Sequence, residues 1–180
     1  MPEPTVILTP SALNRVLTRM AHEIAEKNEE GSQVVLVGIP RGGTALAARL
    51  SKLLEAIWQH PVPAGSLDVS MHRDDLGSHV APVVHGTSLP CDVDGRTVVL
   101  VDDVFFSGRT VRAALDALHD FGRPRKIQLA VLVDRGHREL PIKPDFVGKN
   151  LPTSRQERVD VRFKEEHGED AVHLHRLGAP

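Results

Sequence analysis

The stretch that decides the fold runs from residue 98 to residue 110 and reads Val98-Val99-Leu100-Val101-Asp102-Asp103-Val104-Phe105-Phe106-Ser107-Gly108-Arg109-Thr110. Its first four residues are β-branched or aliphatic, which is typical of a strand buried on both faces of a parallel sheet. Two adjacent carboxylates then stand at the expected carboxyl end of that strand. Because ligands of open α/β sheets bind at such ends, we expect a buried central strand with a functional site directly after it.

The residues that follow the carboxylates predict a phosphate-binding turn. Ser107-Gly108-Arg109-Thr110 supplies hydroxyls, a permissive glycine and a cation. Apolar residues with helical spacing come next, namely Val111, Ala114, Leu115 and Leu118. The first turn of a helix presents free N–H groups and the positive end of the helix dipole, which suit a phosphate monoester. Asp102 and Asp103 are acceptors that suit the vicinal hydroxyls of a ribose.

Two other interpretations of this segment are weaker. The acidic pair could cap the following helix, but a cap needs one acceptor rather than two. The pair could also belong to a receiver-like phospho-acceptor site. Such a site would need a further strand end that carries a lysine, and it would have no use for the sequence Ser-Gly-Arg-Thr.

Composition limits the class of protein. With 180 residues, of which 41% are hydrophobic and 26% charged, the chain is sized for a single globular domain over residues 1–180. Cys91 is the only cysteine, which excludes an intramolecular disulfide and a cysteine-rich zinc site. The start, Met1-Pro2-Glu3-Pro4, lacks the layout of a secretory signal, and the apolar runs are too short to span a membrane. We therefore expect a cytoplasmic protein without a membrane partner.

Strand and helix patterns alternate along the chain. Helices are expected over residues 9–28, 46–57 and 111–118, and strands over residues 33–39, 67–72, 98–104, 126–134, 145–148 and 158–164. This order predicts a mostly parallel α/β sheet with right-handed crossovers and flanking helices. Residues 73–95 are polar and rich in Gly, Pro and His, which is typical of a functional loop or a lid hairpin.

Residues 98–110 resemble the signature with which type I phosphoribosyltransferases bind 5-phosphoribosyl 1-pyrophosphate (PRPP). Collinear segments between about residues 10 and 165 further resemble one branch of that family, the PyrR proteins, which are pyrimidine-operon attenuation regulators and uracil phosphoribosyltransferases. The matching segments are residues 17–24, 37–39, 67–69, 73–76, 109–118, 127–142 and 145–150. The resemblance implies a phosphoribosyltransferase core with a small hood built from the N-terminal and C-terminal segments.

The resemblance implies the conversion of uracil and PRPP to UMP and pyrophosphate, with Mg²⁺ held mainly by the substrate and no dedicated protein ligand. It implies that Asp102 and Asp103 bind the ribose and that the 5′-phosphate is held by Phe106, Ser107, Gly108, Arg109 and Thr110. The remaining implied positions are Arg41 and Gly42 in a pyrophosphate loop, Arg73, Asp74 and Asp75 in the lid, and Val133, Asp134 and Arg135 at the uracil. Pro40, Gly43 and His72 depart from the pattern of the family.

The resemblance also implies a regulatory role in which UMP or UTP favours binding to a leader hairpin of pyrimidine-operon mRNA. The net charge of −2 gives no overall attraction to nucleic acid, so a local basic surface must serve. Residues 135–164 hold eight Lys or Arg against four acidic residues, which could equally form an ordinary solvated surface. By resemblance the RNA-binding residues are Thr18, Arg19, His22, Arg138, Lys143 and Lys149, and the protein is a homodimer or homotetramer.

Two further hypotheses remain open. The chain could be a phosphoribosyltransferase without RNA regulation, possibly for another base, or a regulator whose catalysis has decayed. The intact Asp102-Asp103 pair and phosphate turn argue against decayed catalysis, and His22 and Lys149 favour the dual role. His173 and His175 alternate on a possible last strand, but no third metal ligand is evident, and we interpret them as surface residues.

Overall fold

The computed structural model describes residues 3–29, 31–73 and 86–176, which form a parallel core sheet and a smaller antiparallel sheet. The five core strands have the order β3-β2-β4-β5-β6, and every neighbouring pair is parallel. Their bounds are β2 (Val34–Gly38), β3 (Ala64–Ser66), β4 (Thr97–Phe105), β5 (Lys126–Asp134) and β6 (Phe146–Asn150). This arrangement confirms the predicted α/β architecture, with the quoted stretch on the central strand.

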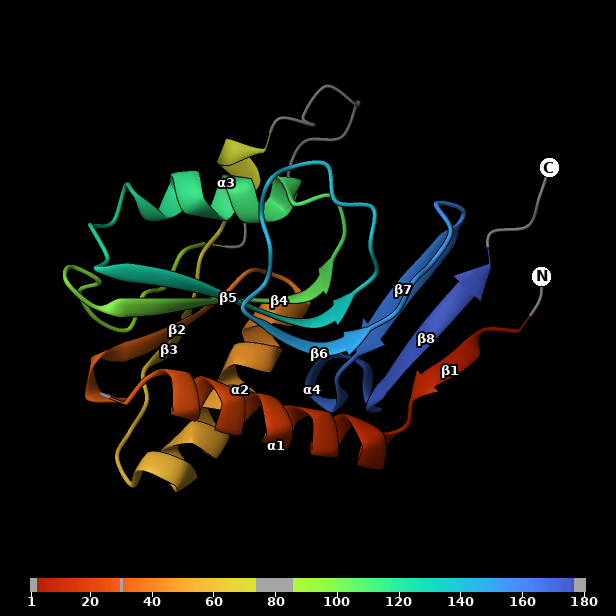
Figure 1. Cartoon of the computed structure of the whole chain (residues 1–180), viewed down its shortest axis with the longest axis horizontal. Helices are drawn as coiled ribbons and strands as arrows, with labels where there is room; N and C mark the ends of the chain where they lie inside the picture. The colour runs from red at the N-terminus through yellow and green to blue at the C-terminus, as the bar shows by residue number, and fades with distance from the viewer. Residues whose placement is uncertain (1–2, 30, 74–85, 177–180) are drawn as a thin grey trace.

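Helices cover both faces of the core sheet (Figure 1). The helix α1 (Pro10–Lys27) and the helix α2 (Gly42–Trp58) pack on one face, and α3 (Arg109–Leu118) packs on the other. All five residues of β2 and the first six of β4 are buried, because both faces of these strands are covered. Thr9 caps α1 by accepting the Ala12 N–H at 3.4 Å, so the predicted helix start is confirmed.

The smaller sheet is the hood. It consists of β1 (Thr5–Leu8), β8 (Ala171–Arg176) and β7 (Glu157–Arg162) in that order, and it joins the two terminal segments as the resemblance implied. Figure 1 places it beyond the carboxyl ends of the core strands. A short helix, α4 (Lys164–His167), lies between β7 and β8.

Arg49 of α2 ties the hood to the core. Its guanidinium reaches Glu165 at 2.5 Å and Asp170 at 2.6 Å, and it lies over the ring of Phe163 at 4.9 Å. This arginine forms ion pairs with two carboxylates of the hood and thereby holds the pKa of both below the usual range.

The strand predicted over residues 67–72 is wrong. The strand beside β2 is the three-residue β3, and residues Ser70–His72 form the short 3-10 helix η2. The Asp68 carboxylate accepts the Ser70 N–H at 2.9 Å, and the His72 N–H bonds the Val69 carbonyl at 3.0 Å. A local side-chain acceptor therefore turns the chain where the apolar alternation indicated extension.

Three further points concern a short 3-10 turn, the predicted lid and membrane spans. A second 3-10 turn, η1 (Gly31–Gln33), precedes β2. Most of the predicted lid, including Asp74 and Asp75, lies outside the described residues. Among the described helices, none combines the length and apolar character that crossing a membrane requires.

Candidate active site

The acidic pair lies in the last third of β4, with Asp102 beside Val131 of β5. Neighbouring side chains of a strand leave it on opposite faces, yet the two carboxylates stay close enough to share a side-chain hydrogen bond. Asp102 is buried and lines a pocket of about 310 Å³. Asp103 lies against Gly42 in the turn between β2 and α2. The pair thus faces two different structures at the carboxyl edge of the sheet.

Burial and the neighbouring Asp103 charge raise the pKa of Asp102 well above its usual value, and the positive charge of Arg73 opposes this shift. Each carboxylate also accepts the N–H of the following residue, Asp102 from Asp103 at 3.0 Å and Asp103 from Val104 at 2.9 Å. Burial and the second carboxylate therefore disfavour the ionised form of Asp102, and a cation or a hydroxyl donor in the pocket would oppose this effect.

The predicted phosphate turn lines the same pocket. Gly108 has φ of +95°, a left-handed conformation that a glycine adopts without strain, and it precedes the first residue of α3. The Ser107 hydroxyl accepts the Arg109 N–H at 3.3 Å. The first helical turn leaves further N–H groups without intrahelical partners. Residues 105–111 thus present hydroxyls and amides to one cavity, which Arg73 also lines.

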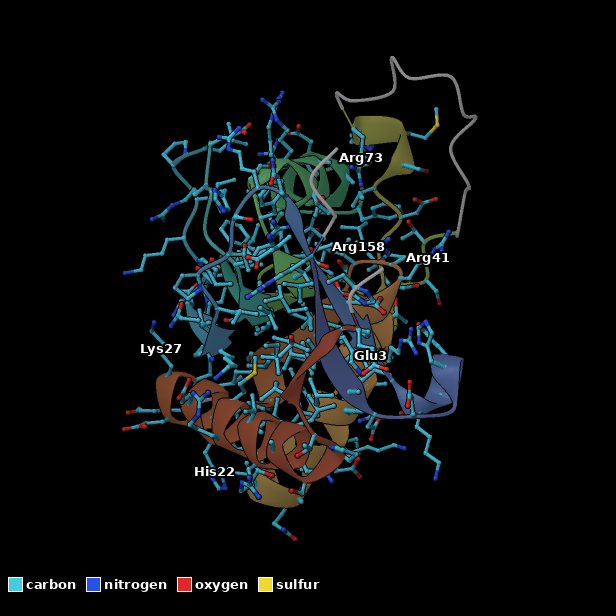
Figure 2. The ribbon with its side chains drawn as sticks, turned by 90° about the vertical axis from the view of Figure 1, so that its right-hand side faces the viewer. Glu3, His22, Lys27, Arg41, Arg73 and Arg158 are labelled. Carbon is cyan, nitrogen blue, oxygen red and sulfur yellow. The ribbon has the colours of Figure 1, made fainter. Side chains whose placement is uncertain are left out.

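The turn between β2 and α2 packs against the acidic pair. A Cβ added to Gly42 would overlap the Asp103 carboxylate, and one added to Gly43 would overlap the Val101 carbonyl. The Pro40–Arg41 peptide bond is cis. The exposed Arg41 side chain has no hydrogen bond or ion pair within the described residues. Figure 2 labels Arg41 and Arg73, and the exposed guanidinium of Arg41, one residue before Gly42, can bind a polyanion.

Glu139 is a site residue that sequence reasoning missed. It lines the Asp102 pocket, accepts a hydrogen bond from the Arg109 side chain at 3.3 Å, and donates its N–H to the Ser107 carbonyl at 2.9 Å. It comes from the loop between β5 and β6, 30 residues after Arg109. No local sequence pattern marks such a long-range contact.

The predicted uracil residues lie at the end of β5, beside the end of β4: Val133 and Asp134 are its last two residues, and Arg135 follows it. Val133 is buried, and the Asp134 carboxylate accepts the Gly136 N–H at 3.0 Å. The Arg135 guanidinium donates to the Ser154 and Glu157 carbonyls at 3.0 and 2.7 Å. Burial lowers the pKa of Arg135. These side chains are engaged within the protein, so contacts to a base would come from the backbone of this segment.

Phe106 connects the phosphate turn to that segment. Its ring lies 4.3 Å from the Arg135 guanidinium and meets the His137 ring edge-on at 5.6 Å. The ring also lines the Asp102 pocket. The Phe106 ring therefore belongs to the wall between the phosphate turn and the end of β5, and only the backbone of this residue could contact the phosphate.

The predicted RNA-binding residues lie on both sides of the edge strand β6. Thr18, Arg19 and His22 are exposed on α1, and Arg19 donates to the Val147 carbonyl at 3.3 Å and pairs with Glu23 at 2.5 Å. Gly148 faces α1, so Lys149 points to the other face of the sheet by strand alternation. The other two, Arg138 and Lys143, are exposed in the loop between β5 and β6.

No group of three or more His, Cys, Asp or Glu residues suited to a metal occurs in the described part of the chain. His173 and His175 contact each other with ring centroids 6.3 Å apart, and His175 lies 3.7 Å from Asp160. Both histidines are half-buried on the same face of β8, and Nδ1 of His173 is buried without a hydrogen-bond partner in the described residues.

This fold, with a phosphate turn and an acidic pair at the carboxyl edge of a parallel sheet, defines a phosphoribosyltransferase domain, and the model of the family described as "Phosphoribosyl transferase domain" matches residues 7–165. Solved structures agree on the fold. The hypoxanthine phosphoribosyltransferase of Trypanosoma cruzi gives a TM-score of 0.73 at 18% identity, covering 96% of each chain. A hypoxanthine phosphoribosyltransferase of Staphylococcus aureus gives 0.71 at 18% identity, covering 94% of this chain and 90% of that one.

Within this class, curated relatives are much more similar in sequence. The bifunctional protein PyrR of Roseiflexus sp. (strain RS-1) is 58% identical and covers 96% of both chains. The bifunctional protein PyrR of Streptomyces coelicolor is 61% identical over 89% of this chain and 83% of its own length. The chain therefore belongs to the PyrR family.

Proposed function

We propose that this protein transfers the phosphoribosyl group of PRPP to uracil, and that it also binds pyrimidine-operon leader mRNA in a manner controlled by UMP or UTP. The observation that carries the catalytic half is the single pocket shared by Asp102, Arg73 and the phosphate turn. Its polar groups match the ribose, pyrophosphate and 5′-phosphate of one substrate. We place the protein in the cytoplasm, where mRNA and these metabolites occur, as a homodimer or homotetramer.

The chain would act by holding and shielding PRPP rather than by covalent catalysis. The ring N1 of uracil forms a bond to C1′ of the ribose, the bond from C1′ to the pyrophosphate oxygen breaks, and the N1 proton passes to solvent. Ser107, Gly108, Arg109 and Thr110 would hold the 5′-phosphate on the N-terminus of α3. A rigidly held ribose and a screened oxocarbenium-like transition state account for the acceleration.

The acidic pair and the β2–α2 turn would divide the remaining contacts. Asp102 would accept ribose hydroxyls from the pocket side, and Asp103 from the side of Gly42. Arg41 would neutralise the departing pyrophosphate, with the backbone of Gly42 beside it. Arg73 begins the segment assigned to the lid, together with Asp74 and Asp75, and it would close over the bound substrate.

The donor set of the site fits Mg²⁺ brought in by PRPP. Asp102 and Asp103 are hard oxygen ligands, whereas the described residues offer no group of three metal-binding side chains. Bound Mg²⁺ would neutralise charge on the pyrophosphate as the C1′ bond breaks. The two carboxylates would orient its waters and the ribose hydroxyls, directly or through one water.

The regulatory half would use the edge strand β6 and its two sides. His22 on α1 and Lys143 in the β5–β6 loop are exposed, and neither side chain forms a hydrogen bond or ion pair within the described residues. Cations would bind phosphates, and His22 and Thr18 would contact unpaired bases of the hairpin. The β5–β6 loop also carries Glu139 of the pocket, so one loop borders both the nucleotide site and the proposed RNA surface.

One experiment tests the regulatory half. A fluorescent hairpin from a pyrimidine-operon leader is titrated with protein at two salt concentrations, with and without UMP. We expect UMP to tighten binding. Hairpin affinity that UMP leaves unchanged would contradict ligand-controlled regulation and leave a phosphoribosyltransferase without RNA regulation.

A matched pair of variants tests the catalytic half. Asp103→Asn should abolish UMP formation and leave hairpin affinity nearly intact, because it removes a ribose contact without touching β6. Asp116→Asn, an exposed carboxylate of α3 that lies 3.8 Å from Arg112, removes the same charge outside the pocket and should retain turnover. Full turnover in Asp103→Asn would contradict the assigned ribose contact.

A further inference from the structure

The loop between β5 and β6 packs directly on the phosphate turn. The Glu139 N–H of this loop donates to the Ser107 carbonyl at 2.9 Å. Leu140 and Ile142 cover Gly108, because a Cβ added to that glycine would lie 3.5 and 3.9 Å from their Cβ atoms. Figure 1 shows the loop arching beside the start of α3. The loop and the phosphate turn therefore cannot move independently of each other.

Glu139 places a carboxylate in a pocket whose other groups suit a phosphate. It lines the Asp102 pocket, and its Oε2 lies 3.3 Å from Nε of Arg109 in the phosphate turn. The phosphate of a nucleotide monophosphate carries about two negative charges at neutral pH, so it repels the Glu139 carboxylate. It also attracts the same guanidinium, because arginine binds carboxylates and phosphates with the same fork of donors. A bound 5′-phosphate and Glu139 therefore compete for Arg109.

A second arginine is within reach of the same carboxylate. Oε1 of Glu139 lies 4.0 Å from Nη2 of Arg155, which follows β6 and does not line the pocket. The Arg155 side chain is 72% exposed and that of Arg109 is 47% exposed, so the pair with Arg155 is the more solvated of the two. Glu139 thus has an alternative partner outside the phosphate turn when a phosphate displaces it from Arg109.

The residue before Glu139 belongs to the proposed RNA surface. Arg138 is exposed, and its Nη1 donates to the Ile142 carbonyl at 3.1 Å across the β5–β6 loop. Because the two residues are adjacent in the chain, a movement of Glu139 shifts Arg138 and weakens this hydrogen bond. A guanidinium released from the loop is then available to an RNA phosphate.

We propose that Glu139 couples the nucleotide site to the RNA surface. A bound 5′-phosphate takes Arg109 from Glu139, the Glu139 carboxylate turns to Arg155, and the β5–β6 loop releases Arg138 for the hairpin. This proposal rests on the proposed function and names the contact through which the nucleotide controls RNA binding. UMP and UTP both carry a phosphate on O5′, so this group is required for the effect of either nucleotide.

The test compares Glu139→Gln with Glu169→Gln, which removes an exposed carboxylate 2.8 Å from Arg162 in the hood. Without nucleotide, Glu139→Gln should bind a fluorescent leader hairpin about 2- to 5-fold more tightly than the wild type, the range that an exposed ion pair supplies. UMP affinity without RNA should rise by a similar factor, because coupling between two sites is reciprocal. The further tightening of hairpin binding by UMP should shrink, and Glu169→Gln should match the wild type in all three measurements.

Uridine lacks the 5′-phosphate and separates this route from one through the base. At a concentration that displaces labelled UMP, uridine should leave the hairpin affinity of the wild type unchanged, and tightening equal to that by UMP would overturn the proposal. So would a Glu139→Gln variant with wild-type affinities, or one that binds UMP and the hairpin more weakly, as a merely structural residue would. These results leave the proposed function in place. A wild type whose hairpin affinity does not respond to UMP would overturn the regulatory half of the proposed function itself.

Discussion

Replacing Gly42 with alanine tests whether the β2–α2 turn and the acidic pair form one catalytic unit. A Cβ at this position would lie 2.7 Å from Cγ and 2.9 Å from Cβ of Asp103. Carbon atoms need about 3.5 Å for ordinary contact, so the turn or the carboxylate must move by about 0.8 Å. Misplacement of a catalytic group by about 1 Å can cost about 100-fold in rate, equivalent to about 2.7 kcal/mol of transition-state stabilisation.

We therefore expect Gly42→Ala to lower kcat/KM for PRPP by about 100-fold, measured as UMP formation at saturating uracil and Mg²⁺. The overlap should also cost about 1–3 kcal/mol of folding free energy, as insertions into a packed region do. Rates must therefore be normalised to the folded fraction from a melting curve.

Gly31→Ala is the matched control. Its added Cβ would lie 2.6 Å from Cε2 and 2.8 Å from Cε3 of Trp58, so it imposes a similar overlap before β2, at the other end of the sheet. This variant should lose comparable stability and keep its normalised kcat/KM. Wild-type kcat/KM in Gly42→Ala, or an equal loss in Gly31→Ala, would refute the proposed link between turn and carboxylate.

Three further predictions concern two buried polar side chains, Asp102 and Gln128, and the half-buried Arg49. Asp102→Asn should abolish turnover yet raise the melting temperature at neutral pH. The raised pKa of Asp102 means that the folded state binds the proton more tightly than the unfolded state, so the stability of the wild type falls as pH rises above about 4. The difference in melting temperature between the variant and the wild type should therefore close below that pH. The Gln128 amide is buried and has no partner in the described residues, so Gln128→Leu should raise the melting temperature by about 2–6 °C, and a lower value would indicate a satisfied amide. Arg49→Met should cost about 1–2 kcal/mol at pH 7 by chemical denaturation, since both carboxylate partners are partly solvent-screened. This deficit should shrink as pH falls below about 4, because the lowered pKa of Glu165 and Asp170 stabilises the fold only while they are ionised; a constant deficit would indicate lost packing against Phe163.

The elements that sequence predicted best are those whose pattern is enforced by burial. The strands β4 and β5 were predicted correctly because both of their faces are covered, and a strand covered on both faces has a continuous run of apolar residues. Residues 67–72 show the limit of this reasoning. Leu67 and Val69 are buried, as the alternation predicted, but Met71 is 74% exposed. The chain turns here instead of continuing as a strand, and the Asp68 carboxylate accepts a hydrogen bond within that turn.

The substrate pocket divides in the same way. Asp102, Gly108 and the phosphate turn lie in one segment, so their proximity follows from chain connectivity and from the strand-to-helix turn. Glu139 and Arg73 come from distant segments, and their presence in the pocket depends on how the loops fold over α3. The segments before β4 and β5 show the same dependence, because Arg96 and Arg125 are 29 residues apart and meet through a backbone hydrogen bond.

By itself, the sequence determined the parallel sheet, its central strand and the chemistry at the end of that strand, because hydrophobic periodicity and adjacent polar residues are local properties of a chain. Only the tertiary structure decided that Asp103 lies against Gly42 while Asp102 lines the pocket, and that the Arg135 guanidinium is hydrogen-bonded to the carbonyls of Ser154 and Glu157. These features depend on which segments the fold packs together, and burial and charge compensation are properties of the packed whole.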